Sequence, residues 1–382
     1  MTIVANPKNN SVLYDAAKQR IIQFNDFKLN FDLIKNASIQ NHLLNTREFS
    51  QSPDLYRPVI QDVYSIPPKS QWNFDKLDAS YAHAILNYDS ESKPLAIEHI
   101  LKKYAKLIDS KKIVFEVSGG LDTSLLISVF GEYLNEFSQV GVVSERYEFR
   151  TERQIQEYYF DRCKKSIKIN EDDALPFSNL KNVPFHFLPN KASLFYGRHR
   201  AVIDATKKLE AKYVINGIGL DPMLCNPVSG NINTFRLSKF QWEDDWANSY
   251  LYKPQNLEYV NATIRNPIIN FLWKSRKNEA EDSLKMWARK IFSEKLPSYL
   301  TKYRYKGAFD GVYETGLQVN NDVIIEIYDV AYDTIKIEEL NPNRNKRLLK
   351  RSENLNPEKD INLMATLSYA VWIYAMVRDG II

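Results

Sequence analysis

The sequence predicts an α/β protein built on a parallel sheet with flanking helices. The first observation is three runs of apolar, β-branched and aromatic residues, typical of buried strands, at 113–117, 140–143 and 213–217. The second is that helical segments accompany these runs along the chain, at 125–133, 151–164 and 199–209. Strands that alternate with helices imply right-handed crossovers, which join parallel strands in one sheet.

The segments before and after this centre have different patterns. Residues 1–75 mix short strands and loops: 21–24 is a strand-like run, and Ile66-Pro67-Pro68 ends the segment because proline interrupts regular structure. A helix is expected at 94–107, where apolar residues recur at helical spacing. From about residue 244 the pattern is mostly helical, with a hairpin expected at 323–329. We therefore expect two units, 1–75 and 76–382, and a helical lid within 244–382.

Composition excludes several classes of protein. Lys and Arg number 51 against 47 Asp and Glu, a net charge of +4, which argues against a protein that coats nucleic acid. The two cysteines, Cys163 and Cys225, cannot build a disulfide framework, and the chain has no C-x-x-C pair. The apolar stretch at 363–377 is too short for a membrane span and predicts a buried helix. The N-terminus lacks the pattern of a signal peptide, so we expect a cytoplasmic protein.

The segment that follows the strand at 113–117 carries the strongest chemical signal. It reads Ser-Gly-Gly-Leu-Asp-Thr-Ser over residues 118–124 and leads into an apolar helix. Two glycines allow the backbone to approach an anion closely, and the helix start offers unpaired N–H groups and a positive dipole end. A carboxylate beside a phosphate is repulsive unless a divalent cation bridges them, so Asp122 indicates Mg²⁺.

Two further segments follow in a fixed order. Asn-Gly-Ile-Gly-Leu-Asp occupies 216–221 directly after a strand, and 304–313 reads Arg-Tyr-Lys-Gly-Ala-Phe-Asp-Gly-Val-Tyr after a Leu-Pro pair at 296–297. A weaker echo is Arg-Asn-Pro-Ile-Ile-Asn at 265–270. There is no Walker motif. Together, over about residues 95–320, these segments resemble the synthetase domain of asparagine synthetase-like enzymes, in the ATP-pyrophosphatase (PP-loop) family.

The resemblance implies an adenine nucleotide alpha-hydrolase-like sheet domain that converts ATP to AMP and pyrophosphate. It implies that Asp122 and Asp221 hold Mg²⁺ against the pyrophosphate, and that Lys306 stabilises negative charge in the acyl-transfer transition state. The residues that the resemblance assigns to ATP binding are Val117, Ser118, Gly119, Gly120, Leu121, Asp122, Thr123, Ser124, Val142, Asn216 and Gly217.

The chain departs from the family at two places. Thr2 stands where a glutaminase half would expose its nucleophilic cysteine, so residues 1–75 resemble a shortened, inactive remnant of that half. Ile218 stands where asparagine synthetases carry Glu and β-lactam synthetases carry Tyr, and isoleucine cannot move protons. Deprotonation of the attacking amine must therefore come from the acidic cluster at 243–245, from His199, or from exchange with solvent.

These observations favour an ATP-dependent amide synthetase whose amine lies within its own substrate, such as a lasso-peptide cyclase. The expected substrate bears a carboxylate and an amine and is a peptide, with a leader-peptide-binding protein or protease as an expected partner. The basic run at 344–351 could receive an acidic peptide, and Arg198-His199-Arg200 could meet a phosphate or a carboxylate. Alternatives are a small-molecule lactam synthetase, an intermolecular ligase that uses free ammonia, and a non-catalytic nucleotide-binding scaffold. A tRNA-modifying enzyme would need a cysteine pair and a basic face, and we expect neither nucleic-acid nor membrane binding.

Overall fold

The computed structural model describes five short strands within the first 111 residues, and beyond them residues 112–128, 135–186, 189–217, 246–261, 285–302, 310–350 and 361–382. The expected helix at 94–107 lies outside the described residues. Among the described helices, none has the length and apolar character needed to cross a membrane.

The centre of the fold is a five-stranded, wholly parallel sheet, as the sequence predicts. Its order is β10-β9-β6-β7-β8, with β6 at the centre. The three predicted strands are β6 (Ile113–Glu116), β7 (Ser138–Val143) and β9 (Tyr213–Asn216). Both edge strands, β8 (Lys165–Asn170) and β10 (Glu258–Asn261), lie beyond that prediction.

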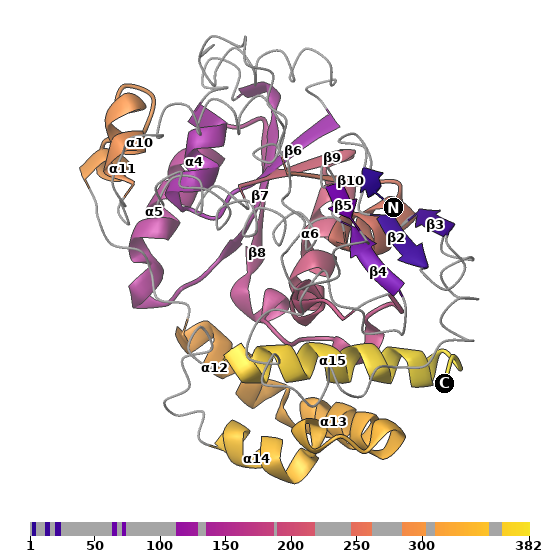
Figure 1. Ribbon diagram of the computed structural model, residues 1–382. Helices are drawn as coiled ribbons and strands as arrows, with labels where there is room; N and C mark the ends of the chain where they lie inside the picture. Colours follow the sequence, from indigo (N-terminus) through magenta and orange to yellow (C-terminus); the bar gives the residue numbers. More distant parts are fainter. Residues whose placement is uncertain are drawn as a thin grey trace.

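Helices cover both faces of this sheet (Figure 1). Helices α4 (Leu121–Ser128) and α5 (Arg150–Phe160) lie on one face, and α6 (Tyr196–Lys208) lies on the other. The predicted helix at 125–133 in fact begins at Leu121, so the polar residues of the glycine loop form its first turn. The predicted α5 ends four residues early, because a turn at 161–164 leads into β8.

In the described residues after 245, the chain is helical apart from β10, and one prediction there was wrong. The expected hairpin at 323–329 is instead the middle of α13 (Asn321–Ile335). Its buried residues Ile324, Ile327, Tyr328 and Ala331 recur at helical spacing, which outweighs the β-branched character of the segment. The apolar stretch near the C-terminus is a buried helix, α15 (Ile361–Arg378), as predicted. The other helices described in this part are α10 (Met286–Ile291), α11 (Ser298–Lys302), α12 (Asp310–Val319) and α14 (Pro342–Lys350).

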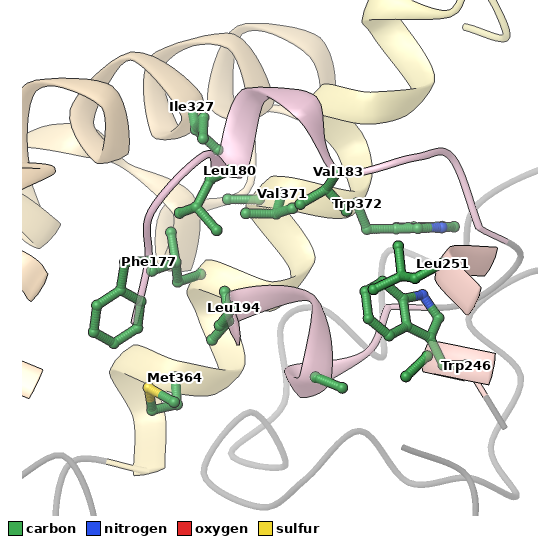
Figure 2. Packing of buried hydrophobic residues seen from close by; sticks show 14 of the residues in the cluster. Phe177, Leu180, Val183, Leu194, Trp246, Leu251, Ile327, Met364, Val371 and Trp372 are labelled. Atoms are coloured by element: carbon green, nitrogen blue, oxygen red, sulfur yellow. The ribbon is translucent and has the colours of Figure 1, made fainter. Parts of the chain in front are cut away.

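A large core joins α12, α13, α14 and α15 to the α6 face of the sheet. Figure 2 shows Leu180 and Val183, from the connection between β8 and α6, beside Val371 and Trp372 of α15, with Ile327 of α13 near Leu180. Phe177 and Leu194 of the same connection belong to this cluster, as does Trp246, which lies beside Leu251. This connection contains three 3₁₀ turns, at Glu171–Ala174, Leu180–Asn182 and Lys191–Phe195. Further 3₁₀ turns lie at Tyr147–Phe149, Lys253–Gln255 and Glu338–Leu340, and Asn248–Tyr252 forms a π-helical turn. Helices α13 and α15 therefore form a structural layer, and the lid predicted within 244–382 stays a prediction.

The N-terminal segment contains the short strands that the sequence predicts. β1 (Thr2–Val4) pairs antiparallel with β5 (Gln71–Asn73), and β2 (Val12–Asp15) pairs with both β3 (Arg20–Gln23) and β4 (Val63–Ile66). The predicted run at 21–24 corresponds to β3, and β4 ends immediately before Pro67 and Pro68. The proline stop was correct for β4, although β5 follows it.

Candidate functional site

The glycine loop forms a tight bend between the central strand β6 and helix α4. Gly119 has φ +76, and a Cβ atom there would lie 2.3 Å from the backbone oxygen of Glu152. A hydroxyl network closes the bend: Ser118 Oγ lies 3.0 Å from Thr123 Oγ1, and Ser124 Oγ donates to the Gly120 oxygen at 2.8 Å. The bend therefore requires glycine at 119 and small hydroxyl side chains around it.

The start of α4 presents polar groups at the edge of the sheet. The helical ladder begins with the Ser124 N–H, which donates to the Gly120 oxygen, so the N–H groups before it have no carbonyl one turn back. Asp122 is the residue of α4 that is not fully buried. Its structural role alone would be to complement the helix dipole. Unpaired N–H groups at a helix start also suit a phosphate.

Two motifs that lie far apart in the sequence meet at this edge. Gly217 directly follows β9, and a Cβ atom there would lie 2.9 Å from the backbone nitrogen and from the hydroxyl of Thr123. The start of the 216–221 segment is therefore packed against the first turn of α4. This close approach explains the need for glycine at 217, and it places Gly217 beside the glycine loop. ATP binding by Asn216 and Gly217 stays a prediction.

The structure adds Lys285, which sequence reasoning missed. Its ammonium pairs with the carboxylate of Asp122, and the two side chains are only 11% and 19% exposed. Lys285 adopts a left-handed conformation directly before α10. A cation held against the loop carboxylate supplies a second charge that could meet a phosphate. No local pattern marks Lys285, because its partner lies 163 residues away.

Another added residue, Gln156, fixes the sheet edge beside the loop. Its amide nitrogen donates to the Val117 oxygen at 2.9 Å and to the Val142 oxygen at 2.8 Å. Val142 itself is half-buried and packs on the large core, on the α6 side of the sheet. Gln156 thus ties together the ends of two neighbouring strands that carry predicted ATP-binding residues.

The comparisons with known proteins leave the family open. No protein-family model matches the chain, and no curated protein matches it. The resemblance stated above therefore rests on the sequence motifs themselves.

Several predicted site residues lie outside the described residues. They are Asp221, Lys306, the Ile218 position, the acidic cluster at 243–245 and the 265–270 segment. Among the described residues there is no group of three or more metal-ligating side chains, which leaves the predicted Asp122–Asp221 pair untested. The donor set that is described fits a phosphate with its cation: a glycine bend, a helix start, hydroxyls, one carboxylate and one ammonium.

The end of the third motif also lies at this sheet edge. Asp310 and Gly311 begin α12, and a Cβ atom on Gly311 would lie 3.2 Å from Nη1 of Arg146, which follows β7. Arg146 also donates to Thr315 Oγ1 at 2.7 Å and to Glu171 Oε1 at 2.5 Å. Arg146 therefore holds the start of α12 beside the carboxyl end of the sheet.

A buried carboxylate stands at the end of β6, two residues before Ser118. Glu116 is 5% exposed, and it accepts hydrogen bonds from Arg198 Nη2 at 2.5 Å and from the Tyr259 hydroxyl at 2.9 Å. The Glu116 carboxylate raises the pKa of the Arg198 guanidinium above its usual value. The sequence did contain a signal for this cluster, since Glu116 interrupts an otherwise apolar strand.

His199, one of the three suggested proton acceptors, is enclosed by aromatic rings. It is 7% exposed, and its ring lies 5.8 Å from Tyr252, 5.5 Å from Tyr259 and 6.4 Å from Trp246. Burial, and secondly the charge of Arg198, lower its pKa to about 3. These contacts favour a packing role, in which His199 is neutral and lacks access to substrate.

We expect Gly119→Ala to destabilise the protein strongly. The positive φ and the close contact with the Glu152 backbone should together cost about 2 to 4 kcal/mol of unfolding free energy. Gly120→Ala is the matched control, because a Cβ atom there meets only Ser118 Oγ at 3.3 Å, and it should cost less than about 1 kcal/mol. Urea unfolding of both variants measures the difference, and equal losses would contradict this account of the bend.

We also expect stability to fall in mild acid because of two buried histidines. Burial lowers the pKa of His186 to about 4, and His199 titrates near 3, so the unfolded chain takes up protons first, near pH 6.5. The unfolding free energy is unaffected by these groups above that pH. Between that pH and its lowered pKa in the folded protein, each removes about 1.4 kcal/mol per pH unit. His199→Phe should lower the slope by about that amount between pH 6.5 and 5, measured by urea unfolding. An unchanged slope would show that His199 does not contribute.

Proposed function

We propose that the protein is an ATP-dependent amide synthetase that releases AMP and pyrophosphate. The observation that carries this proposal is the packing of Gly217 against Thr123, which joins the 118–124 and 216–221 motifs at one edge of a parallel sheet. The carboxyl edge of such a sheet is where ligands bind in open α/β folds. Asp122 and Lys285 add one charge of each sign at the same place.

The described residues suit the first half-reaction. A substrate carboxylate oxygen would attack the α-phosphorus of ATP. The bond between the α-phosphorus and the oxygen that links it to the β-phosphate would break, releasing pyrophosphate and leaving an acyl-adenylate. The start of α4 and the hydroxyls of Ser118 and Thr123 would hold the departing phosphates. Lys285 would exchange its contact with Asp122 for the phosphate charge. Mg²⁺, when bound by Asp122 and Asp221, would neutralise charge on the phosphates.

In the second half-reaction an amine would attack the acyl carbon, with AMP as the leaving group and one proton lost. In this proposal the amine would belong to the substrate itself, so the product would be a lactam or isopeptide. We propose a macrolactam formed on a precursor peptide, as in lasso-peptide cyclases. Small-molecule lactam formation and intermolecular ligation with free ammonia remain the alternatives within this class.

The experiment is to identify the nucleotide product. The purified protein, Mg²⁺ and ATP are incubated with a protein-free extract of the cells that make the protein, and nucleotides are separated by chromatography. AMP with an equal amount of pyrophosphate supports the proposal, and ADP as the main product overturns it. Extract-dependent exchange of labelled pyrophosphate into ATP would report adenylation alone.

A non-catalytic nucleotide-binding scaffold is the second candidate, and Ile218 favours it because the family's proton-transfer residue is missing there. Such a protein would bind Mg·ATP in calorimetry, yet it would form no AMP with any extract. The synthetase proposal predicts both binding and AMP formation.

A further inference from the structure

We propose that the guanidinium of Arg198 binds a carboxylate of the acyl substrate at the carboxyl edge of the sheet. The inference rests on the proposed function, because it assigns an anchor to the acid that the enzyme would activate. Arg198 stands in the first turn of α6, and its partner Glu116 lies two residues before Ser118. In a right-handed crossover the start of α6 lies at the same edge as the phosphate loop.

Arg198 is held in place on one side and open on the other. Glu116 uses both of its carboxylate oxygens, one for Arg198 and one for the Tyr259 hydroxyl. Arg198 remains 36% exposed, and Glu116 is the partner that its guanidinium contacts among the described residues. Glu116 accepts from Nη2, and no hydrogen bond of Nε or Nη1 is seen to the described residues. Their planar fork matches the two oxygens of a carboxylate.

The position of Arg198 fits the direction from which the acid must arrive. Glu116 shares its face of the sheet with Val114 and Val140, which pack on the α6 side. The glycine bend leads to α4, which covers the opposite face (Figure 1). In phosphoryl-group chemistry the attacking and leaving oxygens lie roughly in line. With pyrophosphate at the start of α4, the attacking carboxylate approaches from the α6 side, where Arg198 stands.

Stability alone does not explain this buried carboxylate. Replacing a buried ion pair by apolar residues of similar size is often neutral or stabilising. The neighbouring positions on the same face, Val114, Val140 and Val214, are apolar and fully buried. A valine or leucine at 116 would therefore pack there as well. What Glu116 adds is a fixed orientation for an arginine whose side chain remains 36% exposed.

The test is NMR spectroscopy of the arginine side chains. Protein labelled with ¹⁵N at the arginine Nε is titrated with N-acetyl-aspartate methylamide, which has one side-chain carboxylate, and with its neutral asparagine counterpart. The titrations are run without nucleotide and with Mg²⁺ and α,β-methylene-ATP, which cannot release pyrophosphate. Arg198→Lys identifies the Arg198 signal. Arg200, on the same helix and 40% exposed, is the internal control.

We expect the Arg198 signal to shift and saturate with the aspartate probe, and not with the asparagine probe, while the Arg200 signal stays unchanged. Arg198→Gln should weaken the probe's affinity at least about tenfold, the effect of losing hydrogen bonds to a charged group. Arg200→Gln, which removes the same charge from α6, should not. Thermal unfolding checks that each variant is folded, including the Arg198→Lys protein that assigns the signal, and the titration itself is run on the unaltered protein.

Three results would overturn the inference: no shift at Arg198, equal shifts at Arg198 and Arg200, or displacement of the probe by the ATP analogue. The last would make Arg198 a phosphate contact. Because the titration requires no turnover, its failure is distinct from failure of the synthetase proposal, which the AMP assay decides separately.

Discussion

Asp122→Asn is expected to abolish nearly all AMP formation. The variant loses the loop carboxylate that would anchor Mg²⁺ against the leaving pyrophosphate, a contact worth several kcal/mol at developing charge. We expect a rate reduced by about three orders of magnitude. Asp221→Asn should lose as much, since the resemblance gives it the same role. Quantification of AMP at moderate Mg²⁺ measures both, and a rate close to that of the unaltered protein in either variant would refute its assignment.

The ion pair with Lys285 adds a second, separable effect. Asp122→Asn leaves a largely buried ammonium without its charged partner, so the variant should also lose about 1 to 3 kcal/mol of unfolding free energy. The double variant Asp122→Asn with Lys285→Met removes both charges and should regain most of that stability. It should not regain activity. Recovery of AMP formation in the double variant would mean that Asp122 serves only to neutralise Lys285.

The sheet could be predicted from the sequence where strands are buried on both faces. β6 and β7 read as apolar runs because helices cover both of their sides. β8 escaped prediction because it is an edge strand, and its residues Lys165 and Ser166 are exposed. In α13, the β-branched residues suggested strands, although the helical spacing of Ile324, Ile327 and Tyr328 was already visible.

The site could be predicted only as far as its parts are continuous in the sequence. The glycine bend and the Asn216-Gly217 turn each form a local pattern, and the structure brings them together. The pairs Asp122–Lys285 and Glu116–Arg198 join residues 163 and 82 positions apart, so no spacing rule could reveal them. Only the charge of Glu116 within an apolar strand hinted that a tertiary partner existed.

Lys306→Ala is expected to separate the binding of ATP from its use. The resemblance assigns Lys306 to the transition state. The last part of its motif, from Asp310, forms the start of α12, which Arg146 holds at the carboxyl edge of the sheet. A charge donor that acts only in the transition state contributes to rate and not to ground-state affinity. The variant should therefore bind Mg·ATP almost normally and lose about two to three orders of magnitude in rate.

Lys306→Arg is the matched variant, because it keeps the charge and changes its shape. A planar guanidinium is a poor substitute for a compact ammonium, so we expect little recovery of rate. Calorimetry gives the nucleotide affinity of both variants, and mass spectrometry gives product formation. Equal losses in affinity and rate would make Lys306 a phosphate-binding residue of the ground state. No loss in either would assign the phosphate-facing charge to Lys285 alone, the cation that the described structure already holds against Asp122.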